Sequence, residues 1–313
     1  MNKEKLNNYN LTASYHTMSI KSPGIVQDVQ PEVAECISSS SRNTQHGSET
    51  VSVINPNKLM GDALGYTDFC AAFDTILAGA GIKDYSFIRA DMRFDSYDPE
   101  HYRRYAKLNR YLISMLAVTY NVKNAYRTEN LFNQQQMTVA IKNDYFEVEN
   151  YDRAAKSAIT QNHVEPAKAR LEERTVSRGF RTAYKAAGDG AANLDVLRKE
   201  FSDVWFGRWD KALRNMDLVH KRYNDELEYI YKADKDAFPK RFRSLTDFLI
   251  QYQDCIFCRK QLIDLLSRFD EVKDPATRAK KFKSRYGIEF FSAADVRAAV
   301  DEVKRATTEF FAK

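Results

Sequence analysis

The sequence predicts an α+β fold: an antiparallel sheet with helices on one face, followed by a mainly α C-terminal domain with a winged helix-turn-helix. The sheet is indicated by residues 89–95, where charged and apolar side chains alternate as in a strand with one buried face. The helical domain is indicated by residues 191–235, whose apolar side chains recur at helical spacing. Strands and helices that occupy separate parts of the chain define the α+β class.

Composition sets the expected size and charge of the protein. A length of 313 residues fits one large domain or two ordinary ones, and a hydrophobic fraction of 43% is enough to build a core. The formal net charge of +5 is compatible with a phosphate-bearing partner but does not demand one. Composition therefore leaves nucleic acid open as a partner without selecting it.

The first 50 residues are rich in Asn, Ser, Thr and Gln, and residues 38–45 are all polar. Such a segment buries too little apolar surface to offset the cost of ordering it. We therefore expect residues 1–50 to be disordered, apart from an early strand near Ile25 or Val51. The α+β domain then covers residues 51–188 and the helical domain residues 189–313.

Cysteine usage and hydropathy indicate a cytoplasmic protein that makes no contact with a membrane. The lone Cys255–Cys258 pair lacks the two further ligands of a zinc site, and with Cys36 and Cys70 it forms no disulfide framework. We interpret these cysteines as structural thiols, and the alternative is a metal or redox role. No run approaches the roughly 20 apolar residues of a membrane span, and residues 1–24 lack the apolar run of a signal peptide.

Spacing and turn residues predict the elements of the α+β domain. A helix with apolar residues on one side ends at Gly79 and Gly81, and Pro99 suits the first turn of the next helix. Asn143-Asp144 supplies the turn of a hairpin. The predicted helices are 57–79, 99–120 and 152–162, and the predicted strands are 85–95, 137–142, 145–150 and 168–176.

The C-terminal domain is predicted to be helical with one short strand. Pro239 interrupts the helical pattern, and the next helical stretch, 244–269, is broken near Cys255. A basic helix begins near Asp274, a short strand covers 288–291, and a last helix begins at Ala293. Around 254–266, a short element, a polar start and an amphipathic helix follow one another, as in a helix-turn-helix.

Three predicted strands carry acidic side chains on one face. If these strands are neighbours, their carboxylates converge, and oxygen ligands of this kind suit Mg²⁺ or Mn²⁺. We expect the metal ligands to be Asp91, Asp95, Glu147 and Glu149. The third strand carries Glu172 between Arg170 and Arg174, which would bind neighbouring phosphates, and Tyr151 continues the face of the second strand if that strand extends so far.

This constellation fits a tyrosine nuclease. A tyrosine hydroxyl beside a divalent ion could attack phosphorus and hold a covalent 5′-phosphotyrosine. The alternative interpretation is a solvated face on which arginine and glutamate of adjacent strands pair, as is common in α+β proteins.

Basic residues of the helical domain form a second candidate site. Arg259, Lys260 and Gln261 stand at the start of the second helix of the predicted helix-turn-helix, where side chains reach phosphates or base edges. A basic run downstream contains Lys280, Lys281, Lys283 and Arg285. The alternative is a solvated helical face, which is what basic runs usually form.

Three strings resemble, in order and spacing, motifs of replication initiation factors of plasmids and integrative elements. Residues 89–95 resemble their R-x-D-x-x-x-D strand, 145–156 their aromatic strand leading into a Y-D-K helix start, and 169–174 their R-[IL]-E-x-R strand. Similar strings occur in replication proteins of filamentous phages. The resemblance covers about residues 85–180.

The resemblance implies a rolling-circle initiator, or relaxase core, that nicks one strand of an origin with a tyrosine and a divalent ion. It matches Asp91, Asp95 and Glu172 to the acidic motif positions and Tyr151 to the motif tyrosine. Arg153 stands in place of the family's lysine, Glu173 is an additional acid, and the chain has no His-x-His pair. The implied partners are origin DNA, both duplex and single-stranded, and a host helicase.

Other tyrosines are open as nucleophiles, and other functions as alternatives. The further candidates are Tyr145 and Tyr184, and also Tyr223, Tyr229 and Tyr231, whose helical setting favours packing. The rival functions are a DNA-binding protein without catalysis, such as an accessory factor or repressor, and an interaction protein with no nucleic-acid partner. Convergence of the carboxylates on one tyrosine favours the nuclease, whereas their pairing with Arg89, Arg93, Arg170 and Arg174 favours the DNA-binding protein.

Overall fold

The structure, a computed structural model, describes residues 11–45, 47–61, 65–96, 102–122, 139–152, 169–188 and 192–313. The strands are β1 (Leu11–Pro23), β2 (Ile37–Thr44), β3 (Gly47–Ile54), β4 (Ser86–Ser96), β5 (Val139–Lys142), β6 (Phe146–Asp152) and β7 (Ala169–Val176). The helices are α1 (Asn57–Met60), α2 (Tyr66–Gly79), α3 (Tyr102–Thr119), α5 (Ser177–Ala187), α6 (Asn193–Lys199), α7 (Trp205–Leu213), α8 (Met216–Asp236), α9 (Leu245–Gln251), α10 (Arg259–Leu266), α11 (Pro275–Tyr286) and α12 (Ala293–Ala312). Three short segments complete them: the 3-10 helices η1 (Pro31–Cys36) and η3 (Gln253–Cys255) and the π-helix η2 (Glu200–Val204).

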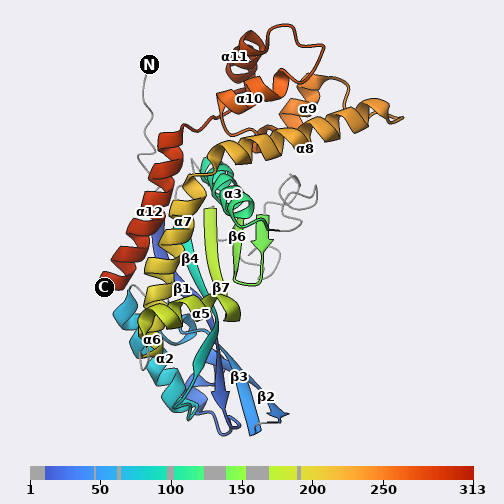
Figure 1. Cartoon of the computed structure of the whole chain (residues 1–313). Coiled ribbons are helices and arrows are strands. Elements are labelled where there is room, and N and C mark those ends of the chain that lie inside the picture. Colours follow the sequence, from blue (N-terminus) through green and yellow to red (C-terminus); the bar gives the residue numbers. More distant parts are fainter. Residues whose placement is uncertain are drawn as a thin grey trace.

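The strands form one seven-stranded sheet in the order β2-β3-β1-β4-β7-β6-β5. Every neighbouring pair is antiparallel. This confirms the predicted α+β class and the antiparallel sheet. Figure 1 shows the sheet with α7 and α12 lying along it and with α8 to α11 gathered at one end.

Alternating side chains give the sheet one apolar and one polar face. On β4, Ala90, Met92 and Phe94 are all buried on the same side. The register places Leu171 beside Phe94, and Val148 one strand further on, opposite Glu173. The apolar face therefore continues across neighbouring strands.

The described helices that contact the sheet cover its apolar face, as expected from the sequence. Tyr15 of β1 packs against Phe69 of α2, with ring centroids 4.6 Å apart, and against Phe310 of α12, at 5.3 Å. Phe146 of β6 packs against Trp205 of α7, at 5.4 Å. One hydrophobic cluster joins these helices to the sheet. It contains buried residues both before and after the predicted start of the helical domain at residue 189.

The expectation that residues 1–50 are disordered is wrong for residues 11–45 and 47–50, and residues 1–10 lie outside the described part. Leu11, Tyr15, Met18 and Ile20 alternate with polar residues and are buried, so β1 contributes to the core. The serine-rich β2 is held by its ladder with β3 and by hydroxyl contacts such as Ser41 Oγ to Thr50 Oγ1, at 2.6 Å. The predicted early strand near Val51 is β3, whereas Ile25 lies in no strand.

Several predicted helices are divided. The predicted helix 57–79 is two helices, α1 and α2, with a positive φ of 73° at Gly61. The predicted helix 191–235 is interrupted by η2 and again at Asn215. The break predicted near Cys255 is confirmed by η3. The predicted helix 152–162 lies outside the described residues after Asp152.

The strand predicted at 288–291 is absent from this described segment. Ile288 and Phe291 are buried, and Phe291 N donates one hydrogen bond of 2.7 Å to Phe257 O, without a ladder. Side-chain burial rather than strand pairing explains the apolar pattern there. The C-terminal region is helical, as predicted, but it shows no wing strand at this position.

Candidate active site on the polar face of the sheet

The register brings the charged residues of three strands into one grid. β7 lies between β4 and β6, so each of its polar residues has a neighbour on both sides. From one end of the grid to the other, its rows are Asp91–Arg174–Glu147, Arg93–Glu172–Glu149 and Asp95–Arg170–Tyr151. The predicted convergence of these residues is therefore confirmed, and β6 extends far enough to carry Tyr151 on the same face.

Tyr151 sits in a hydrogen-bonded group with Glu172 and Arg170. Its hydroxyl donates to Glu172 Oε1 at 2.5 Å and accepts from Arg170 Nη1 at 3.2 Å. Arg170 in turn donates two hydrogen bonds to the carboxylate of Asp95, at 2.6 and 2.7 Å. The guanidinium is thereby fixed in a fork geometry that also suits a phosphate. All four side chains are buried, and Tyr151 is only 2% exposed.

The electrostatics of this group keep the proton on the tyrosine and the charge on the acid. Burial, and then the charge of Glu172, raise the pKa of Tyr151 well above its usual range. For Glu172, burial opposes ionisation, but the hydrogen bond from Tyr151 and the charge of Arg174 outweigh it and lower the pKa. Glu172 is therefore an ionised acceptor pointing at the phenol proton.

Arg174 is the centre of the adjoining ion-pair network. Its guanidinium nitrogens lie 2.6 Å from Glu172, 2.7 Å from Glu149 and 3.5 Å from both Asp91 and Glu147. Burial is the largest influence on Asp91 and raises its pKa, even though Arg89 donates two hydrogen bonds of 2.8 Å to it. The carboxylates thus converge near a tyrosine, which favours the nuclease. They also pair with arginines, which favours the DNA-binding protein without catalysis.

The donor chemistry suits a hard divalent ion, but the arrangement does not. Asp91, Asp95, Glu147 and Glu149 offer carboxylate oxygens, yet each contacts a guanidinium group. Within the described residues, no group of three or more His, Cys, Asp or Glu side chains is arranged to hold a metal ion. The requirement for Mg²⁺ or Mn²⁺ stays a prediction.

His16 is a member of this face that sequence reasoning missed. The register of β1 against β4 shifts between Tyr15 and Met18, and this bulge brings His16 Nδ1 to 4.0 Å from Glu172 Oε1. Its charge, when it is protonated, lowers the pKa of Glu172. Nothing in the sequence pointed to His16, because it is not part of a His-x-His pair and lies in the segment expected to be disordered.

Glu173, the additional acid, lies on the opposite face of β7. Its Oε1 accepts a 2.6 Å hydrogen bond from Trp209 Nε1 in the helical layer. Burial raises the pKa of Glu173 to about 8. This additional acid therefore adds no charge to the polar face.

The other candidate tyrosines lie apart from the grid. Tyr223 is fully buried, with its hydroxyl 2.7 Å from Ser114 Oγ, and Tyr231 packs against Phe248. Tyr184 donates to Asn193 Oδ1 at 3.0 Å. Tyr145 and Tyr229 are both exposed, so the expected packing role of Tyr229 is wrong. Tyr151 is the one candidate among these that contacts the grid carboxylates through a described hydrogen bond.

The predicted DNA-binding residues of α10 divide into two groups. Arg259 and Lys260 are exposed at its first turn, where Lys260 Nζ lies 3.3 Å from Asp217. The expectation for Gln261 is wrong: it is 1% exposed, and its side-chain amide bonds to Cys255 O at 2.9 Å and to Phe257 N at 2.7 Å. Gln261 braces the turn instead of reaching outward.

The basic run forms one exposed side of α11. Lys280, Lys281, Lys283 and Arg285 are all exposed, whereas Ala279 and Phe282 are buried beneath them. The helix begins at Asp274, whose carboxylate caps Thr277 N at 3.0 Å. This separation of charged and apolar sides leaves the basic side available to a polyanion.

The cysteines have packing and capping roles in this structure. All four are free thiols, and Cys255 is buried. Cys258 caps α10 by accepting from Gln261 N at 3.4 Å, and its sulfur lies 3.7 Å from His220 Nε2. Both contacts agree with the interpretation of a structural pair.

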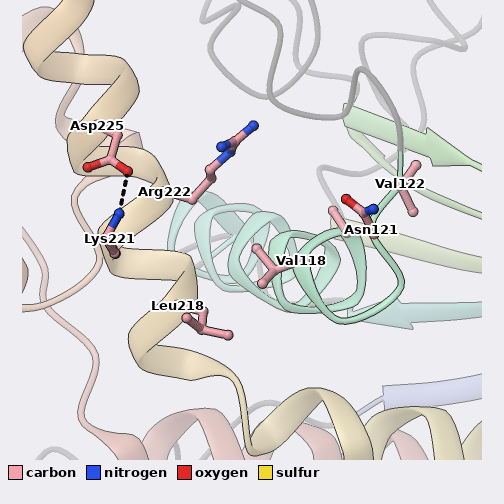
Figure 2. A pocket seen from close by; sticks show the side chains of 8 residues that line it. Val118, Asn121, Val122, Leu218, Lys221, Arg222 and Asp225 are labelled. Atoms are coloured by element: carbon pink, nitrogen blue, oxygen red, sulfur yellow. Dashed lines mark hydrogen bonds and ion pairs between the residues drawn. The ribbon is translucent and has the colours of Figure 1, made fainter.

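A cavity of about 270 Å³ lies away from the grid, between the end of α3 and the first half of α8. Figure 2 shows Val118 and Asn121 on one side and Leu218, Lys221 and Arg222 on the other. None of the predicted site residues lines it.

Comparison with known proteins adds no family. No protein-family model matches the chain, and no curated protein shows a significant match to it. Among the described residues, no helix is long and apolar enough to cross a membrane. The geometry of the site and the three motif strings are therefore the basis for assigning a function.

Proposed function

We propose that this protein is a cytoplasmic replication initiator that nicks one strand of origin DNA through Tyr151 and so starts rolling-circle replication. One observation carries the proposal: the Tyr151 hydroxyl donates to an ionised Glu172 and accepts from Arg170. A nucleophile, a base and a phosphate-binding cation thus occupy adjacent positions. The motif strings support it, because all three residues belong to them.

The chemistry is a phosphoryl transfer that needs no oxidant or reductant. Tyr151 Oη forms a bond to the scissile phosphorus while its proton passes to the Glu172 carboxylate. The bond from phosphorus to the 3′ oxygen breaks, and that oxygen takes a proton from water to become a 3′-hydroxyl. The 5′-phosphate remains on the tyrosine, and Arg170 stabilises the negative charge on its oxygens. Because Tyr151 is 2% exposed, nicking also requires the face to open.

The helical region supplies the proposed contact with duplex origin DNA. Arg259 and Lys260 stand at the N-terminal end of α10, as in the second helix of a helix-turn-helix, and the basic side of α11 adds phosphate contacts. A nick placed by this region would give a host helicase its entry point.

A nicking assay tests the proposal. Purified protein is mixed with labelled single-stranded origin DNA and Mn²⁺, and the products are separated on a denaturing gel. We expect cleavage with the natural protein and none with Tyr151→Phe, while Tyr145→Phe keeps full cleavage. Cleavage that survives Tyr151→Phe would refute the assignment of the nucleophile.

A second function, DNA binding without catalysis, is favoured by one observation. The carboxylates of the grid are paired with arginines, and Arg170, Glu172 and Tyr151 are all buried. Such a network can simply hold the strands together. A clear mobility shift with duplex DNA and no cleavage under any metal condition would select this function.

A further inference from the structure

The exposed edge of α8 and the loop after it carry aromatic and basic side chains that the proposed active site does not use. Leu218, Tyr229 and Phe238 are 53%, 69% and 98% exposed. A single exposed apolar residue is ordinary, but three along one helix and its loop, accompanied by cations, form a surface that needs a partner. Figure 1 shows α8 ending far from the sheet.

Helical spacing places the side chains of this edge in one row. Apart from the adjacent pair Lys221 and Arg222, successive members are three or four residues apart, which brings them to the same face of α8. The row consists of Leu218, Lys221, Arg222, Asp225, Tyr229 and Lys232. Its first four members also line the cavity of Figure 2, where Arg222 extends towards the α3 side.

The loop after α8, which carries the exposed Phe238, is held in place by hydrogen bonds and by packing. The buried carboxylate of Asp234 accepts the backbone N–H of Arg241 at 2.5 Å and of Phe242 at 3.0 Å. Phe242 packs inward against Phe248, with centroids 5.1 Å apart. Phe238 therefore projects from an anchored loop and not from a loose one.

The charge of this loop is strongly positive. Residues 235–243 contain four cations and one carboxylate, which gives a net charge of +3. Lys240, Arg241 and Arg243 are exposed and form no ion pair with any residue in the described part of the chain. Cations that form no ion pair with the described residues, beside an exposed ring, match a polyanion that also carries flat apolar groups.

We propose that the row on α8 and loop 237–243 form a binding track for single-stranded DNA. Proteins bind single strands by stacking successive bases on aromatic rings and by placing cations along the phosphates. Tyr229 and Phe238 are the stacking residues, and Lys240 and Arg243 hold the phosphates. The choice of DNA rests on the proposed function, in which nicking creates a single strand that must be held.

Fluorescence anisotropy with a labelled oligo-dT of about 16 nucleotides tests the track. All proteins carry Tyr151→Phe, so that covalent attachment does not contribute. We expect Tyr229→Ala and Phe238→Ala each to weaken binding by about fivefold or more, which is the lower end for the removal of one stacking ring. Tyr145→Ala, another exposed tyrosine, is the control and should leave binding unchanged. Unchanged binding in the two track variants would overturn the proposal.

A charge variant and two other ligands complete the test. Lys240→Ala with Arg243→Ala should reduce the salt dependence of single-strand binding, by about 0.7 in the log-log slope for each phosphate that the protein no longer neutralises. Binding by the track to duplex DNA, or to vesicles of anionic lipid, in preference to oligo-dT would also overturn the proposal.

The two proposals fail separately. A protein that loses oligo-dT binding with Phe238→Ala but never forms a covalent adduct keeps the track and refutes nicking. A protein that forms the adduct but binds oligo-dT equally well without Tyr229 and Phe238 refutes only the track.

Discussion

The hydroxyl of Tyr151 donates a 2.5 Å hydrogen bond to Glu172 across two neighbouring strands, and both side chains are buried. Their positions are set by the antiparallel register of β6 and β7, in which Tyr151 lies opposite Arg170 and Glu172 lies two residues further along β7. The pair is therefore held by backbone pairing, which makes it a rigid hydrogen-bonded arrangement.

Glu172→Gln should abolish nicking and leave duplex binding intact. The amide has nearly the shape of the carboxylate but cannot take the phenol proton. Nicking is measured on a denaturing gel and binding by mobility shift. Glu32→Gln, a change at an exposed acid of η1 outside the grid, is the control and should retain nicking. Full nicking by Glu172→Gln would remove Glu172 from the reaction.

Arg170→Met should destabilise the protein by about 3–5 kcal/mol, because it removes the two hydrogen bonds that the buried Asp95 carboxylate accepts from Arg170. Urea unfolding measures the difference. The control is Arg42→Met, which breaks an exposed pair with Glu49 and should cost no more than about 1 kcal/mol. Adding Asp95→Leu to Arg170→Met should restore part of the stability. Equal stability of the two arginine variants would contradict the account of the buried pair.

Glu173→Gln should remove part of the pH dependence of stability. The pKa of Glu173 is about 8 in the folded protein and about 4.3 when unfolded. The folded state holds the proton of Glu173 more tightly than the unfolded state does. The resulting contribution of Glu173 to the stability of the protein is therefore fully present below about pH 4.3. It is lost as pH rises towards 8, by about 1.4 kcal/mol per unit of pKa difference. Glutamine is neutral throughout, so the variant should gain stability relative to the natural protein as pH rises. Parallel stability curves from pH 5 to 8 would contradict this burial effect.

Arg259→Ala with Lys260→Ala should weaken duplex binding and lower its salt dependence. Each phosphate that the protein no longer neutralises reduces the log-log slope by about 0.9. Gln261 is the informative contrast, because it braces the turn from inside. Gln261→Ala should lower thermal stability and leave the salt slope unchanged. An unchanged slope in the double variant would place duplex binding elsewhere.

The sequence predicted the sheet where polar and apolar residues alternate clearly, as on β4 and β7. It missed β1 and β2, and among the early strands it predicted only the one near Val51, which is β3. Serine dominates β2, and pairing rather than apolar content orders such a strand. It placed Tyr151 and Glu172 on one face, but their contact depends on register, which sequence alone does not give. His16 was missed because a β-bulge directs it to Glu172.

In the helical region, the sequence predicted features that the structure does not have. The position of Gln261 at the start of α10 suggested an outward polar contact, yet helix geometry turns it towards Cys255. The apolar run 288–291 suggested a strand, but it packs its side chains without a ladder. In both cases tertiary contacts, and not the local sequence pattern, determined where the side chains lie.

The central claim is that Tyr151 becomes covalently joined to DNA, and peptide mass spectrometry tests it most directly. The protein is incubated with single-stranded origin DNA and Mn²⁺, digested with nuclease and protease, and searched for a nucleotide adduct. We predict an adduct on the peptide containing Tyr151, and none with Tyr151→Phe or Glu172→Gln. An adduct on another tyrosine, or cleavage without any adduct, would contradict the account.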